Sequence, residues 1–245
     1  MKRIKSILLL SAFVALVVPQ EACRLSQPSD PRDILHRSFR AHGGEKLTNW
    51  QTLSIEGTVE MMDGIKYHAA YLLYAKMPDK LKVEHDLTAD RGRRFTEYFL
   101  NNGIAWRRQN LIPGQADPAQ LRRWWNQCFG IGYYERNAKS IVLKEQASAA
   151  DSDLGRAYLL EVEADGAVSQ LTIDKKSFYL LREDQGNVRR QYGEFKTFDG
   201  VVCPMTIIET INNRQGETVT PFQIRSVKYN APIEDWLFAE DMPAK

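Results

Sequence analysis

Reactive side chains are few in this 245-residue sequence, and they lie in no arrangement that catalysis or metal binding requires. His36 and His42 are six residues apart on a predicted helix, so they face different sides, whereas a zinc-binding helix needs an i, i+4 pair. His68 and His85 could meet across a hairpin, yet no serine or cysteine occupies the Gly-x-Ser-x-Gly turn of a hydrolase nucleophile. Gly43-Gly44 ends a helix, where a phosphate-binding loop would begin one. We therefore expect no enzyme, no catalytic residue, no metal and no cofactor, and keep an unrecognised hydrolase as an alternative.

Aromatic and apolar side chains are concentrated between residues 65 and 135. Plain core packing accounts for most aromatic residues in most proteins, but such a concentration also suits an apolar ligand cavity. Both interpretations stay open at this point. If a cavity exists, the candidate ligand-binding residues are Ile55, Val59, Met61, Tyr67, Tyr71, Trp106, Leu121, Trp124, Trp125 and Phe129.

Four of these candidates belong to a predicted helix over residues 118–129. Asp117 can cap the helix, and Pro118 suits its first position. An apolar stripe then follows at helical spacing, and glycines at 130 and 132 end the helix. This helix is either a movable lid over the cavity or a permanently docked core element. The stripe consists of Leu121, Trp124, Trp125, Cys128 and Phe129.

From Leu53 the hydrophobic period changes to two, which is typical of a strand with one buried face. We expect Ile55, Val59 and Met61 to face the interior, and the acidic and polar residues between them to face water. Short turns connect the segments that follow, so the topology is antiparallel. The predicted strands cover residues 53–61, 65–75, 81–87, 95–100, 104–107, 140–143, 158–163, 168–174, 178–183, 190–198, 205–211 and 218–229.

Outside the strands, a helix that Asp30 caps is predicted from Pro31 to about His42. Residues 109–116 are rich in turn formers and predict a break. The sequence thus predicts a mainly β (α+β) fold, one antiparallel sheet of about 11–12 strands with helices beside it. The loops are short, so residues 31–245 are expected to form one domain.

The first 22 residues have the features of a signal peptide. A basic start precedes an apolar run of twelve residues, Ile7–Val18, which is too short to span a membrane. Cleavage after Ala22 would place Cys23, a candidate for lipidation, at the start of a short tether over residues 23–30. The net charge of +2 lies entirely within residues 1–22, so the mature chain is neutral. A neutral chain lacks the basic surplus that nucleic-acid binding needs, and we exclude that partner class.

Three cysteines leave an odd count. Cys128 and Cys203 are either a disulfide, which an oxidising compartment would permit, or two separate buried thiols.

The C-terminal half contains a series of short motifs in a fixed order: residues 198–205 (FDGVVCPM), residues 216–220 (GETVT), residues 227–238 (VKYNAPIEDWLF) and Met242-Pro243. In these motifs it resembles the LolA/LolB-like outer membrane lipoprotein-sorting family. Residues 42–47 (HGGEKL) and the segment from Tyr158 to Arg182 agree with the same family, so the likeness extends over about residues 31–243.

The resemblance implies an incomplete antiparallel β-barrel whose open side is covered by helices, with an apolar cavity between them. It further implies a monomeric periplasmic carrier or chaperone that binds the acyl chains of lipids or lipoproteins, with an envelope membrane protein as a further partner. The alternative is an envelope-stress sensory module, which would use the same half-barrel to detect lipids or lipoproteins and to bind a partner protein.

Overall fold

A computed structural model describes residues 28–63, 65–87, 95–144, 156–214 and 216–239. The predicted signal peptide, Cys23 and most of the tether lie outside these residues. No helix in the described ranges is both long and apolar enough to cross a membrane.

In the described part of the chain, the strands form a single antiparallel sheet of 13 strands. Two meanders build it, each with consecutive strands paired to one another. The first meander comprises β1 (Thr52–Asp63), β2 (Ile65–Lys76), β3 (Lys80–Asp86), β4 (Phe95–Asn101), β5 (Ile104–Gln109) and β6 (Ile112–Gln115). The second comprises β7 (Ala138–Lys144), β8 (Ala157–Ala164), β9 (Ala167–Asp174), β10 (Leu180–Gln185), β11 (Val188–Phe198), β12 (Val201–Asn213) and β13 (Gly216–Tyr229).

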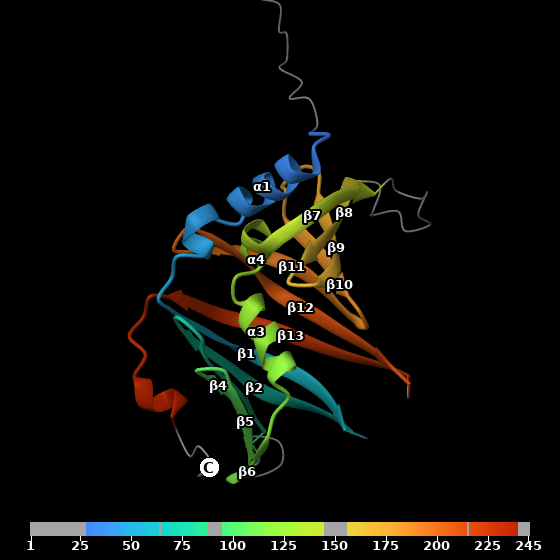
Figure 1. The fold of residues 1–245 in the computed structure, drawn as a ribbon. Helices are drawn as coiled ribbons and strands as arrows, with labels where there is room; N and C mark the ends of the chain where they lie inside the picture. Colours follow the sequence, from blue (N-terminus) through green and yellow to red (C-terminus); the bar gives the residue numbers. More distant parts are fainter. Residues whose placement is uncertain (1–27, 64, 88–94, 145–155, 215, 240–245) are drawn as a thin grey trace, which may run out of the picture.

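The pairing of β1 with β13 joins the two meanders into one sheet. Leu53 lies opposite Tyr229 and Val59 lies opposite Phe222, with a bulge between Glu56 and Gly57. The outermost strands, β6 and β7, are not paired with each other in the described part of the chain, so the barrel is incomplete. Figure 1 shows the twisted sheet with the helices lying along one face.

Among the described residues, three α-helices and two short 3₁₀ helices accompany the sheet: α1 (Pro31–Ala41), η1 (Gly44–Leu47), α3 (Pro118–Gln127), α4 (Ile131–Asn137) and η3 (Asp235–Phe238). As predicted, the Asp30 side chain caps α1 by accepting from the Arg32 amide at 2.9 Å. Asp117 caps α3 in the same way, through the Ala119 amide. The apolar stripe of α1, including Ile34, Leu35 and Phe39, is buried against the sheet and the other helices.

The second predicted helix is shorter than expected and is followed at once by another helix. It ends at Gln127 and not at 129, and the Gly130–Gly132 segment turns directly into α4. Gly130 adopts φ 49° and ψ −133°, a conformation that side chains rarely tolerate. Gly132 packs so closely on η1 that an added Cβ would lie 2.3 Å from Cγ2 of Thr48. These glycines therefore allow a tight corner between two helices. From the sequence alone, they predicted only the end of one helix.

The strand prediction is confirmed for twelve strands, and their ends differ by a few residues. A thirteenth strand, β6, lies in the segment predicted as a break. The residues of β6 have weak strand propensity, and β6 forms because it pairs with β5 around a turn at Asn110-Leu111.

The seam between the meanders predicts a sharp sensitivity at Gly57. A Cβ at this position would lie 2.3 Å from the backbone oxygen of Gln223 in β13, and a backbone atom cannot move aside as a side chain can. We expect Gly57→Ala to lower the free energy of unfolding by about 1–3 kcal/mol, measured by urea denaturation. Gly193→Ala, also within a strand but with no atom within 4 Å of the added Cβ, is the control. Equal effects of the two changes would contradict the close approach at the seam.

Candidate functional site

A partly open cavity of about 360 Å³ lies between the concave face of the sheet and the helices. This volume falls within the range of small-ligand sites. Most of the lining side chains are apolar, and they come from β1–β4 in the first meander, from β10–β13 in the second, and from α3, α4 and the segment between these two helices. They include Leu53, Leu73, Val83, Ile131, Leu180, Ile207, Ile211, Phe222, Ile224 and Val227.

Half of the ten predicted site residues line this cavity. Ile55, Val59 and Met61 reach it from β1, Tyr71 from β2 and Trp124 from α3. The expected alternation along β1 positions the first three, because every second residue faces the interior. The Trp124 ring packs edge-on against Tyr98, with their centroids 5.2 Å apart. Their role in ligand binding stays a prediction.

Three other predicted residues on and after α3 pack in the core instead of lining the cavity. Leu121 is fully buried, and Trp125 and Phe129 surround Trp50. The ring of Phe129 stacks on Trp50 with centroids 5.0 Å apart, and Trp125 meets the same indole edge-on at 5.8 Å. This aromatic cluster attaches the C-terminal end of α3 to the body of the protein.

The structure does not bring Trp106 or Tyr67 to the cavity. Trp106 is stacked on Phe99 at 5.0 Å, and Phe99 points away from the cavity because its neighbour Tyr98 points into it. The buried residues on this outer face form a second small core, beside which the C-terminal η3 packs on β3 and β4. Tyr67 is half-buried in β2 opposite Met61, beyond the lining residues.

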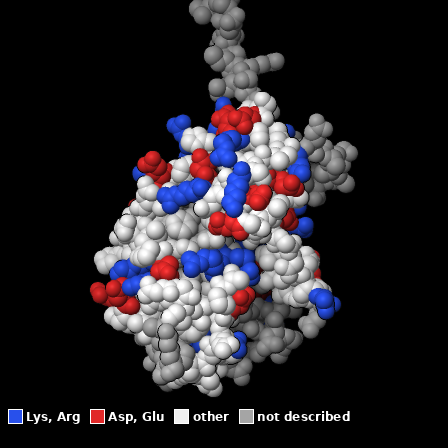
Figure 2. Space-filling view, viewed as in Figure 1, with Lys and Arg blue, Asp and Glu red and all other residues white. Residues whose placement is uncertain are grey.

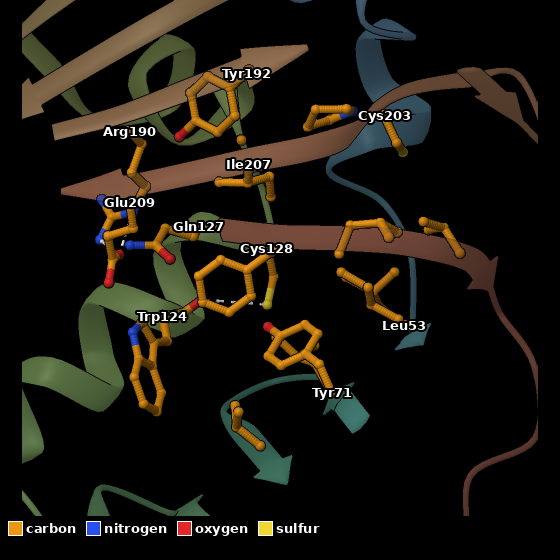
Figure 3. A pocket seen from close by; sticks show the side chains of 18 of the residues that line it. Leu53, Tyr71, Trp124, Gln127, Cys128, Arg190, Tyr192, Cys203, Ile207 and Glu209 are labelled. Carbon is orange, nitrogen blue, oxygen red and sulfur yellow. Dashed lines mark hydrogen bonds and ion pairs between the residues drawn. The ribbon is translucent and has the colours of Figure 1, made fainter. Parts of the chain in front are cut away.

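A buried ion pair that the sequence analysis missed lies at one end of the cavity. The Arg190 guanidinium in β11 donates to the Glu209 carboxylate in β12, with N–O distances of 2.8 and 2.9 Å. In the amide orientation that its neighbours favour, the Gln127 oxygen accepts from the same guanidinium at 2.6 Å. Figure 3 shows these three side chains together at one end, with Leu53 and Cys203 at the other. The cavity therefore has one charged end, and the rest of its lining is largely apolar.

Glu183 extends the polar end behind Arg190. Its two carboxylate oxygens accept from the hydroxyls of Tyr134 at 2.5 Å and Tyr192 at 2.7 Å. Burial and the Glu183 carboxylate raise the pKa of both tyrosines, so their hydroxyls remain donors at neutral pH. The Arg190 guanidinium lies 3.9 Å from Glu183, which places one cation between two carboxylates. A buried charge is tolerated only with such partners.

Two buried histidines also line the cavity. His42 connects α1 to the sheet, because its Nε2 accepts from the Leu180 amide at 3.0 Å while its Nδ1 lies 3.1 Å from the Val202 carbonyl. This geometry requires the neutral ring with the proton on Nδ1, and burial lowers the pKa of His42 accordingly. His85 lies between Tyr71 and Tyr98, and its burial lowers its pKa to about 4.

Cys128 and Cys203 are free thiols, so the two open alternatives resolve in favour of separate buried cysteines. Both line the cavity. Burial raises the pKa of Cys128 to about 12 and also raises that of Cys203, which keeps both as neutral, weakly nucleophilic thiols. In the described ranges, no three His, Cys, Asp or Glu side chains are grouped closely enough to bind a metal ion.

The buried His85 predicts a loss of stability on acidification. Because its folded pKa is about 4 and its ordinary value is 6.5, the unfolded chain takes up the proton first as the pH falls. The stability from neutral His85 is complete above pH 6.5 and decreases by about 1.4 kcal/mol per pH unit between 6.5 and about 4. Between pH 7 and pH 5, the free energy of unfolding, measured by urea denaturation, should fall by about 2 kcal/mol more in the wild type than in His85→Gln. Equal losses in wild type and His85→Gln would contradict the assignment.

No protein-family model and no curated protein matches the sequence. Solved structures do match it. The LolA superfamily protein NE2245 from Nitrosomonas europaea has a TM-score of 0.58 at 13% identity, covering 86% of this chain and 98% of the other. A DUF1329 family protein from Desulfovibrio piger gives the same values. A domain assigned to the outer membrane lipoprotein-sorting proteins of Vibrio parahaemolyticus has a TM-score of 0.53 at 10% identity, covering 85% of this chain and 95% of the other. The chain therefore shares its fold with these three solved structures.

Proposed function

We propose that this chain binds the acyl part of a lipid or lipoprotein in its apolar cavity and carries it within the bacterial cell envelope. The observation that supports this most strongly is the cavity itself, a space of about 360 Å³ with a largely apolar lining and a single polar end. Such a shape complements a molecule with a long hydrocarbon tail and one polar head. The LolA-like fold supports the same proposal.

Hydrocarbon burial alone supplies enough free energy for binding. Each buried methylene contributes about 0.8 kcal/mol, so a 16-carbon chain offers on the order of 12 kcal/mol before the costs of association. The protonation states of His85 and the two cysteines in the lining favour ligand binding over catalysis. Burial keeps His85 and the two thiols uncharged at neutral pH, so they present a nearly neutral wall to a hydrocarbon. We accordingly propose a binding protein without catalytic residues, metal or cofactor.

Location and anchoring follow from the N-terminal features of the sequence. We propose that residues 1–22 direct export to the periplasm, and that Cys23 is the site where a lipid anchor would be attached. Residues 31–245 would then act as one monomeric half-barrel domain on a short tether.

We propose that α3 acts as a lid whose movement admits the ligand. Trp124 contacts the cavity, whereas Trp125 and the following Phe129 pack on Trp50. The free energy of this packing opposes opening, and the free energy of ligand burial can offset it. The competing interpretation is that α3 stays docked and only Trp124 responds to the ligand.

Filling the cavity should weaken binding without unfolding the protein. Ile207 lines the cavity from β12, so Ile207→Trp places an indole where the hydrocarbon would lie. We expect affinity for a 16-carbon amphiphile, measured by isothermal titration calorimetry, to fall by about tenfold or more. Val219→Trp is the matched control, because Val219 in β13 is exposed and lines no part of the cavity. Unchanged affinity in Ile207→Trp would show that the amphiphile binds elsewhere.

Tryptophan fluorescence separates a moving α3 from a docked one. Adding a long-chain amphiphile should change the emission of the wild type, since Trp124 lies at the cavity. If α3 moves, Trp124→Phe should keep part of the change, because Trp125 leaves its contact with Trp50, and a Trp124→Phe/Trp125→Phe variant should remove it. If Trp124→Phe alone removes the whole change, α3 stays docked. Flat emission in the wild type, with binding shown by calorimetry, would also exclude the lid.

A further inference from the structure

A second hollow, a cleft of about 900 Å³ with a more polar lining, lies beside the apolar cavity. It is bounded by α3 and α4 on one side and by residues of β8–β11 and their turns on the other. Gln127, Gly130 and Tyr192 line both spaces, so the cleft and the cavity adjoin at these residues. They are also the residues at or next to the polar end of the cavity. An elongated ligand can therefore have one part in each space.

Three arginines and two acidic side chains line this cleft, which leaves a surplus of positive charge. Arg122 and Arg123 of α3 and Arg136 of α4 line it, and Figure 2 shows a band of basic side chains over the position of α3. Arg122 and Arg123 are exposed, and neither has an acidic partner within ion-pair distance among the described residues. Arg136 donates to the Asn49 side chain at 2.8 Å.

The acidic side chains that line the cleft are already engaged. Asp165 accepts from the Tyr133 hydroxyl at 2.9 Å. Glu183 accepts from Tyr134 and Tyr192, as described above. Hydroxyl donors thus stabilise both carboxylates, while the two guanidinium groups of α3 remain available to an external anion.

We propose that the ligand is an anionic amphiphile, with its acyl chain in the apolar cavity and a phosphate-bearing head group in the cleft against Arg122 and Arg123. This inference rests on the proposed function and specifies its ligand class. Guanidinium groups bind phosphate oxygens in a bidentate geometry and are more weakly hydrated than ammonium groups, which suits them to this head group. α3 contributes to both parts of the site, since Gln120 and Trp124 line the cavity and the two arginines line the cleft.

The test compares two probes that share a 16-carbon chain and differ in head group. Lysophosphatidic acid carries a phosphate, and monoacylglycerol is its neutral counterpart. We expect the wild-type chain to bind lysophosphatidic acid about tenfold more tightly in low salt, which corresponds to about 1.4 kcal/mol. Arg122→Gln/Arg123→Gln should lose this preference and keep the affinity for monoacylglycerol. Arg107→Gln/Arg225→Gln removes the same charge from two exposed arginines outside both spaces and should keep the preference.

Each outcome separates the head-group proposal from the proposed function. Equal affinity of the wild type for the two probes, or a preference that survives in Arg122→Gln/Arg123→Gln, overturns the head-group site and leaves the cavity intact. Loss of preference in the control variant as well shows a general charge effect and also overturns it. If neither probe binds the wild type, the proposed function fails. Inorganic phosphate that binds as tightly as lysophosphatidic acid, and depends on the same arginines, would assign the cleft to free phosphate and overturn the amphiphile.

Discussion

The pairing of the first strand with the last one is the constraint on which the rest of this structure depends. β1 and β13 are more than 150 residues apart in the chain, and their hydrogen bonds turn two local meanders into one sheet. The bulge at Glu56–Gly57 brings the two backbones into contact at the point where Gln223 approaches. Without this seam, β12 and β13 would not face β1–β3, and the cavity between them would not form. The helices then cover an apolar concave face that water would otherwise contact.

Local sequence patterns predicted most of the helices and strands, because residues close together in the sequence determine them. The period-two alternation of β1 and the Asp30-Pro31 start of α1 are properties of neighbouring residues. β6 and α4 were missed for the opposite reason. β6 is ordered by pairing with β5, and α4 begins at Gly130 in a conformation that resembles a helix end until its packing on η1 is known. The β1–β13 seam itself has no local signal.

The site was predictable only where a single strand or helix determined it. The alternation in β1 places Ile55, Val59 and Met61, whereas the pairing of Arg190 with Glu209 also requires the register of the β11–β12 hairpin, which the Asp199-Gly200 turn fixes. A signal was nevertheless present, since Arg190 and Tyr192 share a strand face, as do Ile207, Glu209 and Ile211. A charged residue between apolar ones of the same parity indicates a buried pair. Trp106 shows the reverse error, because aromatic character alone does not say which face of a strand is the inner one.

The one-sided position of the Arg190–Glu209 pair gives the cavity a direction. If the proposed function holds, a single-tailed guest would bind with its methyl end toward the Leu53 and Cys203 end, because the opposite orientation would place hydrocarbon against buried charges. The span between the two ends would then select for tail length. A longer tail would leave methylenes in water and a shorter one would leave space unfilled. Each methylene that is not buried would reduce the binding free energy by about 0.8 kcal/mol. The same ion pair that stabilises the interior would in this way discriminate between guests that differ only in the number of carbons.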